Sequence, residues 1–471
     1  MAAENDAMAA ESETRERWEA AGQGHVFRFW GDLGAAARER LLRQLARFDP
    51  APLARAAREA AAGPRLHAED LAPPEAVFAP GDLGRGALEG AGAAELAAGR
   101  VAVLTVAGGQ GTRLGFDGPK GAFPIGPVSE RSLFELFAQR IAGLGRRHGR
   151  PVPWIVMTSP ATDAATRAFF AAHGDFGLEP GQTRFVVQGS LPALDLEGRA
   201  LLAAPDRLAE APDGHGGVFA ALLASGALAE LAERGLERVF YHHVDNPLVR
   251  VGDPAFLGLH AVRGAEMSCK AVEKLDALES MGFLCQRAGR TEVIEYSEIP
   301  AEIAAARAPD GGLRFRLGSV GIHVLERRFL ERVAAGPPLP LHAARKPVRA
   351  LGRDGAPATV EAWKLERFVF DALARARVVA LMETLRRDEY SPVKHAGGAA
   401  SPETARRDLV ASYRRWIDEA GLEPPEEDPG AQLLIEIDHA QIDGPDALVG
   451  PPGRRITDVA PHVRIAKGAE R

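Results

Sequence analysis

Short apolar runs alternate with stretches of helical spacing between residues 100 and 275. Four-residue and three-residue steps between apolar side chains follow Ser132 and Glu135, a pair that matches the capping box at a helix start. Buried strands that alternate with helices are typical of an α/β fold with a mostly parallel sheet and helices on both faces. The runs that we predict to be strands are "RVAVLTVAGG", "VPWIVMTS", "TRFVVQGS", "RVFYHHVDN" and "AEMSCKAVEK".

The regions on either side of this alternating stretch have a different pattern. Residues 1–98 predict a helical N-terminal region, in which residues 1 to about 20 are expected to be frayed and Leu41 and Leu45 share one face of an amphipathic helix. Beyond about Arg375 the chain is rich in arginine, proline and acidic residues, with short strand-like pieces "LLIEID" and "HVRIA". We therefore expect three parts: 1–98, a central α/β domain at 99–375, and a small C-terminal domain at 376–471.

Composition excludes several classes of protein. The 471 residues are 46% hydrophobic and carry a formal net charge of −7, which argues against binding nucleic acid through bulk charge. Two cysteines give no disulfide framework, and neither a signal peptide nor a membrane-length apolar run is evident. We expect a soluble cytoplasmic protein without a membrane contact, and no obligate protein partner is evident.

The most suggestive polar and glycine positions follow three of the predicted strands. Gly108 and Gly109 follow the first, Gln188 follows the third, and Asp245 and Asn246 follow the fourth. Ligands of parallel α/β sheets bind just beyond the carboxyl ends of the strands. These positions are therefore the candidate ligand site.

The glycine-rich stretch "LTVAGGQGTRLGFDGPKG" fits neither common nucleotide-binding motif fully. A dinucleotide fingerprint needs a third glycine where Leu114 stands, and a P-loop needs Ser or Thr after its lysine, whereas Lys120 lies between Pro119 and Gly121. Backbone N–H groups of successive glycines, with Arg113 and Lys120, suit phosphate oxygens in a more general way. The other interpretation is a tight strand-to-helix turn with two solvated cations.

A wider set of motifs identifies a family resemblance. "GGQGTRLG" and "PKG" are followed in order by "QGSLPAL", "EAPDGHGGVF", "VDNPLV", "VEK", "EYSEI", "KLERFVFD" and "RRDEYSPVKHA". Together they resemble eukaryotic-type UDP-N-acetylhexosamine pyrophosphorylases, in the superfamily of UDP-glucose and UDP-sugar pyrophosphorylases. The resemblance implies a Rossmann-like nucleotidyltransferase domain between the N-terminal region and a small C-terminal domain.

The resemblance also implies a reaction. A sugar 1-phosphate attacks the α-phosphorus of UTP, and the products are a UDP-sugar and pyrophosphate. Asp245 would be a ligand of Mg²⁺, Lys120 would neutralise the β- and γ-phosphates, and Lys394 would neutralise the sugar phosphate. Arg113 either bridges phosphates or pairs with a carboxylate, and for His243 a packed histidine is favoured over a second metal ligand. Only seven of the 57 basic residues are lysines, which suggests that lysine geometry matters where it is kept.

Binding roles are implied for two groups of residues. Gln188 offers both a donor and an acceptor, as the edge of uracil demands, and glycine at 214 allows a close backbone approach. Phe368 and Phe370 would lie near an N-acetyl methyl group, although "RFVFD" equally suits core packing. The implied nucleotide-binding residues are Val106, Ala107, Gly108, Gly109, Gln188 and Gly214, and the implied sugar-binding residues are His215, Gly282, Glu295, Ser319, Phe368 and Phe370.

Two of these positions depart from the family pattern. His215 and Ser319 stand where the N-acetylhexosamine enzymes carry asparagines, near the acetamide and near a sugar hydroxyl, and the more distant UDP-glucose enzymes have a histidine in the corresponding glycine turn. N-acetylglucosamine 1-phosphate leads as the substrate, with glucose 1-phosphate or broad use of sugars as the alternative. A non-catalytic nucleotide-sugar sensor and an NAD-dependent enzyme are less favoured, because Lys120, Asp245 and Lys394 are all present and the dinucleotide fingerprint is incomplete.

Overall fold

The computed structural model of the protein describes residues 2–63, 66–424, 432–448, 454–456 and 463–468. Its centre is a mixed sheet whose main path runs β2-β17-β11-β14-β10-β3-β4-β5. β10, β3, β4 and β5 pair in parallel, as do β11, β17 and β2, whereas β14 is antiparallel to both of its neighbours. The predicted α/β fold with a mostly parallel sheet is therefore confirmed, with β14 as the antiparallel exception. The strands of this path are β2 (Val77–Phe78), β3 (Val101–Val106), β4 (Trp154–Thr158), β5 (Thr183–Val187), β10 (Arg238–His243), β11 (Met267–Glu273), β14 (Leu317–Glu326) and β17 (Val379–Glu383).

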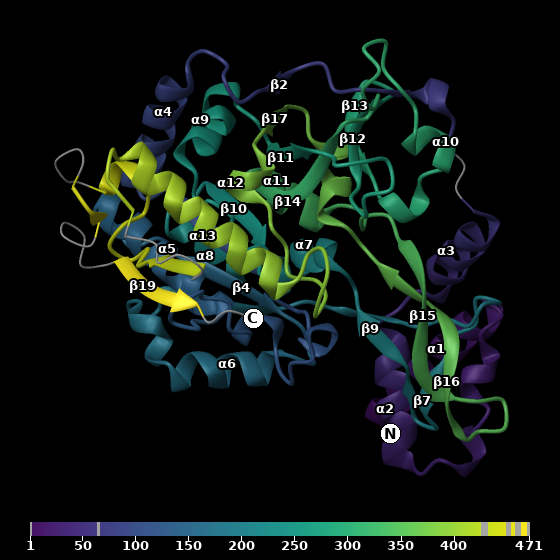
Figure 1. Ribbon diagram of the computed structural model, residues 1–471. Coiled ribbons are helices and arrows are strands. Elements are labelled where there is room, and N and C mark those ends of the chain that lie inside the picture. Colours follow the sequence, from purple (N-terminus) through teal and green to yellow (C-terminus); the bar gives the residue numbers. More distant parts are fainter. Residues whose placement is uncertain (1, 64–65, 425–431, 449–453, 457–462, 469–471) are drawn as a thin grey trace.

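Side chains of each central strand alternate between two hydrophobic cores, as the two-residue period of a strand requires. Along β3, Val101 and Val103 face one core and Ala102 and Leu104 face the other. The first core includes α5 (Leu133–His148), α9 (Pro254–Arg263) and α13 (Pro402–Glu419), and the second includes α7 (Val218–Ala224), α8 (Ala227–Glu233) and α11 (Arg327–Ala335). Helices thus cover both faces of the sheet (Figure 1).

The local helix signals are confirmed where the sequence was explicit. α5 begins after Ser132, whose hydroxyl accepts from the N–H of Glu135 while the Glu135 carboxylate accepts from the N–H of Ser132, so the capping box is complete. α4 (Arg85–Ala97) packs on α9 through Gly92 and Gly258. A Cβ on either glycine would lie within 2 Å of a backbone oxygen of the other helix, so only glycine permits this approach.

The expectation of a frayed N-terminus was wrong. Residues Ala2–Ala20 form helix α1, and Trp18 near its end is wholly buried and donates from Nε1 to the carbonyl of Leu45 at 3.1 Å. The polar composition of this segment suggested fraying, but one apolar face is enough to pack a helix against the protein while its other faces remain in water. α1 packs beside α2 (Ala35–Ala46), and α3 (Pro50–Ala62) contributes to the same hydrophobic core.

A separate hydrophobic core joins these N-terminal helices to segments far away in the sequence. Its partners are the long hairpin β15 (His342–Leu351) and β16 (Pro357–Glu366) and the short strands β6 (Ser190–Pro192), β7 (Leu202–Ala204) and β8 (Arg207–Leu208). β6 pairs with β9 (Glu210–Pro212). Figure 1 shows this lobe, with α1 and α2 beside β15 and β16, set apart from the sheet.

At the other end of the chain, α13 and the paired strands β18 (Gln432–Ile437) and β19 (Val463–Gly468) pack against the core that contains α5. These strands are the pieces expected from "LLIEID" and "HVRIA". The three-part division of the chain stays a prediction; β17 lies beyond its second boundary, yet pairs with β11 in the central sheet.

The remaining strands are β1 (Leu71–Ala72), β12 (Phe283–Arg287) and β13 (Arg290–Ile294), which extend one end of β14. Within the described residues, no single helix has the length and apolar character to cross a membrane. One bent pair, His215–Ala224 with Ala227–Glu233, meets that test of length and composition only when the two are taken together.

Candidate active site

The ends of β3, β5 and β10 place the predicted nucleotide residues at one edge of the sheet. Val106 is the last residue of β3, and the N–H of Ala107 donates to the carbonyl of Met157 on the neighbouring strand at 2.7 Å. A Cβ on Gly108 would lie 2.7 Å from the Gln188 side-chain oxygen, so glycine is what lets the loop and this amide approach. The structure therefore brings Gly108 and Gln188 together, two of the residues that sequence reasoning assigned to uracil, whereas Gly214 packs against Arg367.

The glycine-rich loop folds back on its own beginning. The N–H of Gly111 donates to the carbonyl of Gly118 at 2.8 Å, and the N–H of Lys120 donates to the carbonyl of Gly109 at 3.0 Å. This closure turns the buried Lys120 side chain toward the end of β10. Arg113, by contrast, is exposed and forms no ion pair with any residue in the described ranges.

Two lysines flank a single carboxylate. Lys120 Nζ lies 3.7 Å from Asp245 Oδ2, and the charge of Lys394 also acts on Asp245. Burial opposes ionisation of Asp245, but the charges of Lys120, His243 and Lys394 outweigh it and lower the pKa of this carboxyl group. Burial likewise opposes the charge of Lys394, but Tyr390 and Asp245 outweigh it and raise the pKa of the ammonium group. Asp245 is thus an anion between two cations at physiological pH.

Beside this cluster lies a cavity of about 140 Å³. It collects predicted residues from seven separate stretches of the chain, and it adds others that the sequence did not single out. The predicted residues that line it are His215, Gly282, Glu295, Ser319, Phe370, Asp245 and Lys394; the unpredicted ones include Tyr390, Met281, Tyr296 and Gly321. Tyr390 lies within the quoted motif "RRDEYSPVKHA", so its position was available even though its role was not.

Phe368 and Gly214 stand behind this cavity wall. The Phe368 ring stacks on the His215 ring with centroids 5.1 Å apart, and Phe370 meets His215 edge to face at 5.7 Å. Gly214 has a φ of +84°, and a Cβ there would lie 2.4 Å from the carbonyl oxygen of Arg367. The phenylalanines therefore contribute to both interpretations, because they pack together and also shape the sugar cavity.

His215 has a fixed hydrogen position. Its Nδ1 accepts a hydrogen bond from the backbone N–H of Val369 at 3.0 Å. Burial and the neighbouring histidines His243, His323 and His342 hold the pKa of His215 well below its usual value, so the ring is neutral. A neutral ring that accepts at Nδ1 carries its hydrogen on Nε2, which leaves Nε2–H as a donor.

Glu295 is the acidic group of the cavity. Burial and the nearby carboxylate of Glu298 raise its pKa, His342 and Lys394 lower it, and the net result is a pKa of about 7. The backbone around it is close, because a Cβ on Gly282 would meet the carbonyl oxygen of Ile294 at 2.9 Å. Glu295 is therefore a carboxyl group that changes charge close to neutral pH.

The other predicted sugar residue, Ser319, lies on β14 beside Gly282. Its N–H donates to the carbonyl of Gly282 at 2.9 Å, and its hydroxyl contacts Cys269 Sγ at 3.6 Å. His243, by comparison, pairs through Nε2 with the Tyr241 hydroxyl at 3.0 Å, which fits the favoured interpretation of a packed histidine.

Sequence reasoning also missed a buried aspartate and a half-buried histidine. Asp213 is 5% exposed, burial raises its pKa to about 6, and Oδ1 of its carboxylate has no hydrogen-bond partner among the described residues. His342 bridges Glu298 at 2.6 Å and Asp371 at 2.9 Å. Only the quoted motifs "PDGHGG" and "EYSEI", which contain Asp213 and Glu298, gave a sequence signal for either group.

The donor set around Asp245 offers a metal ion few protein ligands. No cluster of three or more His, Cys, Asp or Glu side chains with metal-binding geometry occurs among the described residues. Mg²⁺ is usually held by one or two carboxylates together with water and substrate phosphates. The single anionic carboxylate of Asp245, at the end of β10, fits a Mg²⁺ site of this kind and would not suit a metal site built from protein ligands alone.

Comparison with known proteins assigns the family. The model of the UTP–glucose-1-phosphate uridylyltransferase family matches residues 59–397. The chain belongs to this uridylyltransferase family. All of the site residues discussed above, from Val106 to Lys394, lie inside the matched stretch.

Sequence similarity to known proteins extends over most of the chain. Human UDP-N-acetylhexosamine pyrophosphorylase-like protein 1 is 39% identical over 439 residues, which cover 88% of this chain and 87% of that protein. UDP-N-acetylglucosamine pyrophosphorylase of Saccharomyces cerevisiae is 37% identical over 339 residues, or 69% and 71% of the two chains. Among solved structures, the uridine diphosphate N-acetylglucosamine pyrophosphorylase of Trypanosoma brucei has a TM-score of 0.78 at 26% identity and covers 93% of this chain and 94% of that one.

Proposed function

We propose that the protein transfers a uridylyl group from UTP to N-acetylglucosamine 1-phosphate and releases pyrophosphate. The observation that carries the proposal is the position of the Lys120–Asp245–Lys394 cluster. It lies between the nucleotide edge of the sheet and a cavity lined by His215 and Glu295. The relatives named for N-acetylglucosamine and N-acetylhexosamine support the choice of sugar.

The chemistry needs little proton transfer. The second pKa of a phosphate monoester is about 6, so the sugar phosphate is already a dianion at neutral pH and needs no general base. One of its oxygens forms a bond to the α-phosphorus of UTP while the bond from that phosphorus to the β-phosphate oxygen breaks, and pyrophosphate leaves. The protein supplies positioning and charge neutralisation.

The two lysines divide that charge. Lys120, which extends from the closed glycine loop, is assigned to the β- and γ-phosphates, and Lys394, whose side chain lines the cavity, is assigned to the sugar phosphate. Arg113 is exposed on the same loop, where it is free to meet a triphosphate that enters from solvent. Asp245 is assigned to Mg²⁺, which when bound neutralises phosphate charge and orients the α-phosphate.

The sugar is recognised by other residues that line the same cavity. Glu295 as a carboxylate accepts hydrogen bonds from two neighbouring hydroxyls, and the His215 Nε2–H donates to the acetamide carbonyl. The Phe368 and Phe370 rings contact each other, with centroids 5.0 Å apart, and both contact the His215 ring. Phe370 lines the cavity, where it presents an apolar surface to the acetamide methyl.

One observation favours a broader alternative. Ser319 is smaller than the asparagine of the resembled family, and a shorter side chain leaves a hydroxyl of the sugar less closely held. Glucose 1-phosphate, or several sugar 1-phosphates, would then be substrates as well. We place the reaction in the cytoplasm, since both cysteines are free and buried.

The deciding experiment follows pyrophosphate release from UTP with four sugar 1-phosphates, in Mg²⁺ and in excess EDTA. The sugars are N-acetylglucosamine, N-acetylgalactosamine, glucose and galactose. We expect turnover with the acetylated sugars that is lost in EDTA and in Asp245→Asn. Preference for glucose would establish the alternative, and UTP binding without turnover of any sugar would indicate a nucleotide-sugar sensor.

A further inference from the structure

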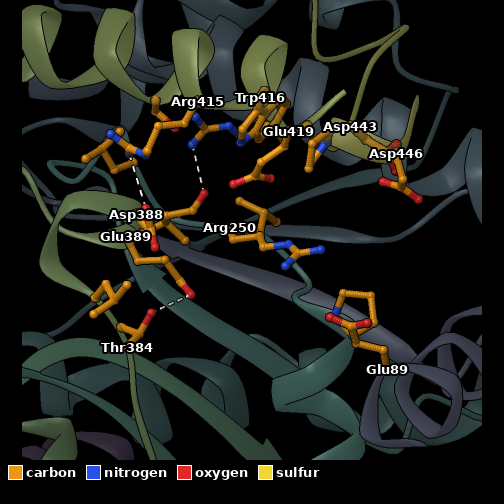
Figure 2. Close-up of a pocket in the computed structure, with 18 of the residues that line it drawn as sticks. Glu89, Arg250, Thr384, Asp388, Glu389, Arg415, Trp416, Glu419, Asp443 and Asp446 are labelled. Carbon is orange, nitrogen blue, oxygen red and sulfur yellow. Dashed lines mark hydrogen bonds and ion pairs between the residues drawn. The ribbon is translucent and has the colours of Figure 1, made fainter. Parts of the chain in front are cut away.

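Residues 389–394 form a wall between two cavities. Tyr390, Pro392 and Lys394 line the sugar cavity, whereas Glu389 lines a larger cavity of about 760 Å³ on the side of α13 and the 439–446 segment. Figure 2 shows this larger cavity, with Glu389 and Thr384 on one wall and Trp416 and Glu419 on another. The middle of this segment is anchored by Val393 in the hydrophobic core that contains α5, whereas Glu389 and Lys394 at its two ends face the two cavities and are held by polar contacts.

A buried ion cluster holds the beginning of this segment. Lys270 Nζ donates to Glu389 Oε1 at 2.5 Å and to Asp253 Oδ2 at 2.7 Å, and all three side chains are almost completely buried. Arg250 lies 3.6 Å from Asp253, so two cations balance two carboxylates. The Thr384 hydroxyl also donates to Glu389 Oε1 at 3.2 Å, while Oε2 has no partner in the described part of the chain.

The backbone of the same segment is attached to the residues around Asp245. Asn246 donates from Nδ2 to the carbonyl of Glu389 at 2.7 Å and accepts from the N–H of Ser391 at 3.0 Å. The carbonyl of Asp245 accepts from the N–H of Val393 at 2.7 Å. In return, Lys120 Nζ donates to the carbonyl of Val393 at 3.4 Å. Asp245, Lys120 and Lys394 are thus joined through one stretch of backbone.

We propose that Glu389, held by Lys270, is a positioning residue that fixes Lys394 against the sugar phosphate. The inference rests on the proposed uridylyl transfer. Glu389 touches no substrate in this account; it anchors the start of a segment whose other end presents Lys394. A displacement of about 1 Å at a catalytic group is enough to cost a large factor in rate. A buried ion pair is weak evidence for stability alone, so its use here in fixing a conformation has to be tested separately from folding.

A matched control, Glu95, lies near the start of β10, at the end of that strand away from Asp245. Glu95 is also a buried carboxylate, and it pairs with Arg100 at 2.7 Å and with Arg238 at the start of β10. Loss of either carboxylate breaks a buried ion pair, but only Glu389 lies next to the site. Glu95→Ala therefore reports the cost of the broken pair without any effect on Lys394.

The test is a double-mutant cycle. Glu389→Ala should lower kcat/KM for the sugar 1-phosphate at least tenfold and leave the Kd for UTP within twofold, whereas Glu95→Ala should change neither. Glu389→Gln keeps an acceptor for Lys270 and should restore most of the rate. In a Lys394→Ala background, Glu389→Ala should change kcat/KM less than twofold, because the residue through which it acts is gone.

Three results would overturn the inference. Equal effects of the Glu389 and Glu95 variants would assign Glu389 to stability alone, and a full effect of Glu389→Ala in the Lys394→Ala background would make the two residues independent. A wild-type protein without any pyrophosphate release would overturn the proposed function and the inference together, whereas with an active wild type the variants test the inference alone.

If Glu389→Ala does not fold, as judged by circular dichroism, Glu389→Gln replaces it in the same double-mutant cycle, with a smaller expected loss in kcat/KM of about threefold.

Discussion

At the scale of single residues, we expect Glu295 to make the proposed reaction depend on pH. Its pKa of about 7 arises from burial and from Glu298, so it is largely protonated at pH 6 and ionised at pH 8. Only the carboxylate accepts from two sugar hydroxyls. We expect kcat/KM for the sugar 1-phosphate to rise about tenfold from pH 6 to pH 8, in steady-state assays at saturating UTP.

The matched control for this prediction is Glu295→Gln. The variant should have a lower kcat/KM at pH 8 and retain only the inflection near pH 6 that belongs to the sugar phosphate itself. Stability gives a second readout with a defined sign. The native state binds this proton more tightly than the unfolded chain, so the contribution of Glu295 to the free energy of unfolding falls as pH rises from about 4.5 to 7. The free energy of unfolding of the glutamine variant should therefore increase relative to that of wild type over this pH range. An unchanged pH profile in the variant would contradict the assignment.

In the proposed reaction, we expect His215 to discriminate between acetylated and plain sugars. His215→Phe keeps the aromatic contacts with Phe368 and Phe370 but removes the Nε2–H donor, so it should lower kcat/KM for N-acetylglucosamine 1-phosphate about tenfold relative to glucose 1-phosphate. The lost acceptor for the Val369 N–H affects both sugars equally and cancels in the ratio. His215→Asn, which supplies an amide donor, should retain more of the preference, and an unchanged ratio in both variants would remove His215 from sugar recognition.

At the scale of elements, His342 links the start of the β15–β16 hairpin to Glu298, three residues after Glu295 of the sugar cavity, and to Asp371. Burial lowers the pKa of His342, but its hydrogen bonds with Asp371 and Glu298 outweigh this and raise the pKa to about 10. The stabilisation is therefore complete below about pH 6.5 and is lost as pH rises through about 10. We expect His342→Gln to be less stable than wild type by about 2–4 kcal/mol at pH 6, and the difference to disappear above pH 10, in urea unfolding at each pH. A constant difference across this range would assign the loss to packing.

The same elements show what a sequence predicts and what it leaves open. The five central strands and α5 follow from local signals, namely apolar runs of strand length and a capping box, and these signals do not depend on the rest of the chain. The site residues at the ends of β3, β5 and β10 follow as well, because parallel strands bring their carboxyl ends to one edge. The antiparallel insertion of β14 and the bridging role of His342 depend on which distant segments meet, and periodicity carries no information on that.

At the scale of the whole molecule, the lobe formed by α1–α3 and the β15–β16 hairpin has its own hydrophobic core. Trp18 is its largest fully buried side chain, and its replacement by alanine removes both the ring and the hydrogen bond to Leu45. Trp18→Ala should destabilise this lobe by about 3–5 kcal/mol. Since the lobe core shares no residue with the two cores of the sheet, we expect calorimetry to show an earlier separate transition while the main transition stays in place.

The consequence for activity follows from where the lobe joins the site. β16 ends at Glu366 and leads directly to Arg367 and Phe368 behind the sugar cavity, whereas the glycine loop of the nucleotide edge follows β3 of the central sheet. Below its first transition Trp18→Ala should turn over at the wild-type rate. Between the two transitions it should still bind UTP, yet its KM for the sugar 1-phosphate should rise several-fold as Phe368 loses its support. A single shifted transition, or simultaneous loss of UTP binding, would mean instead that the lobe and the sheet unfold as one unit.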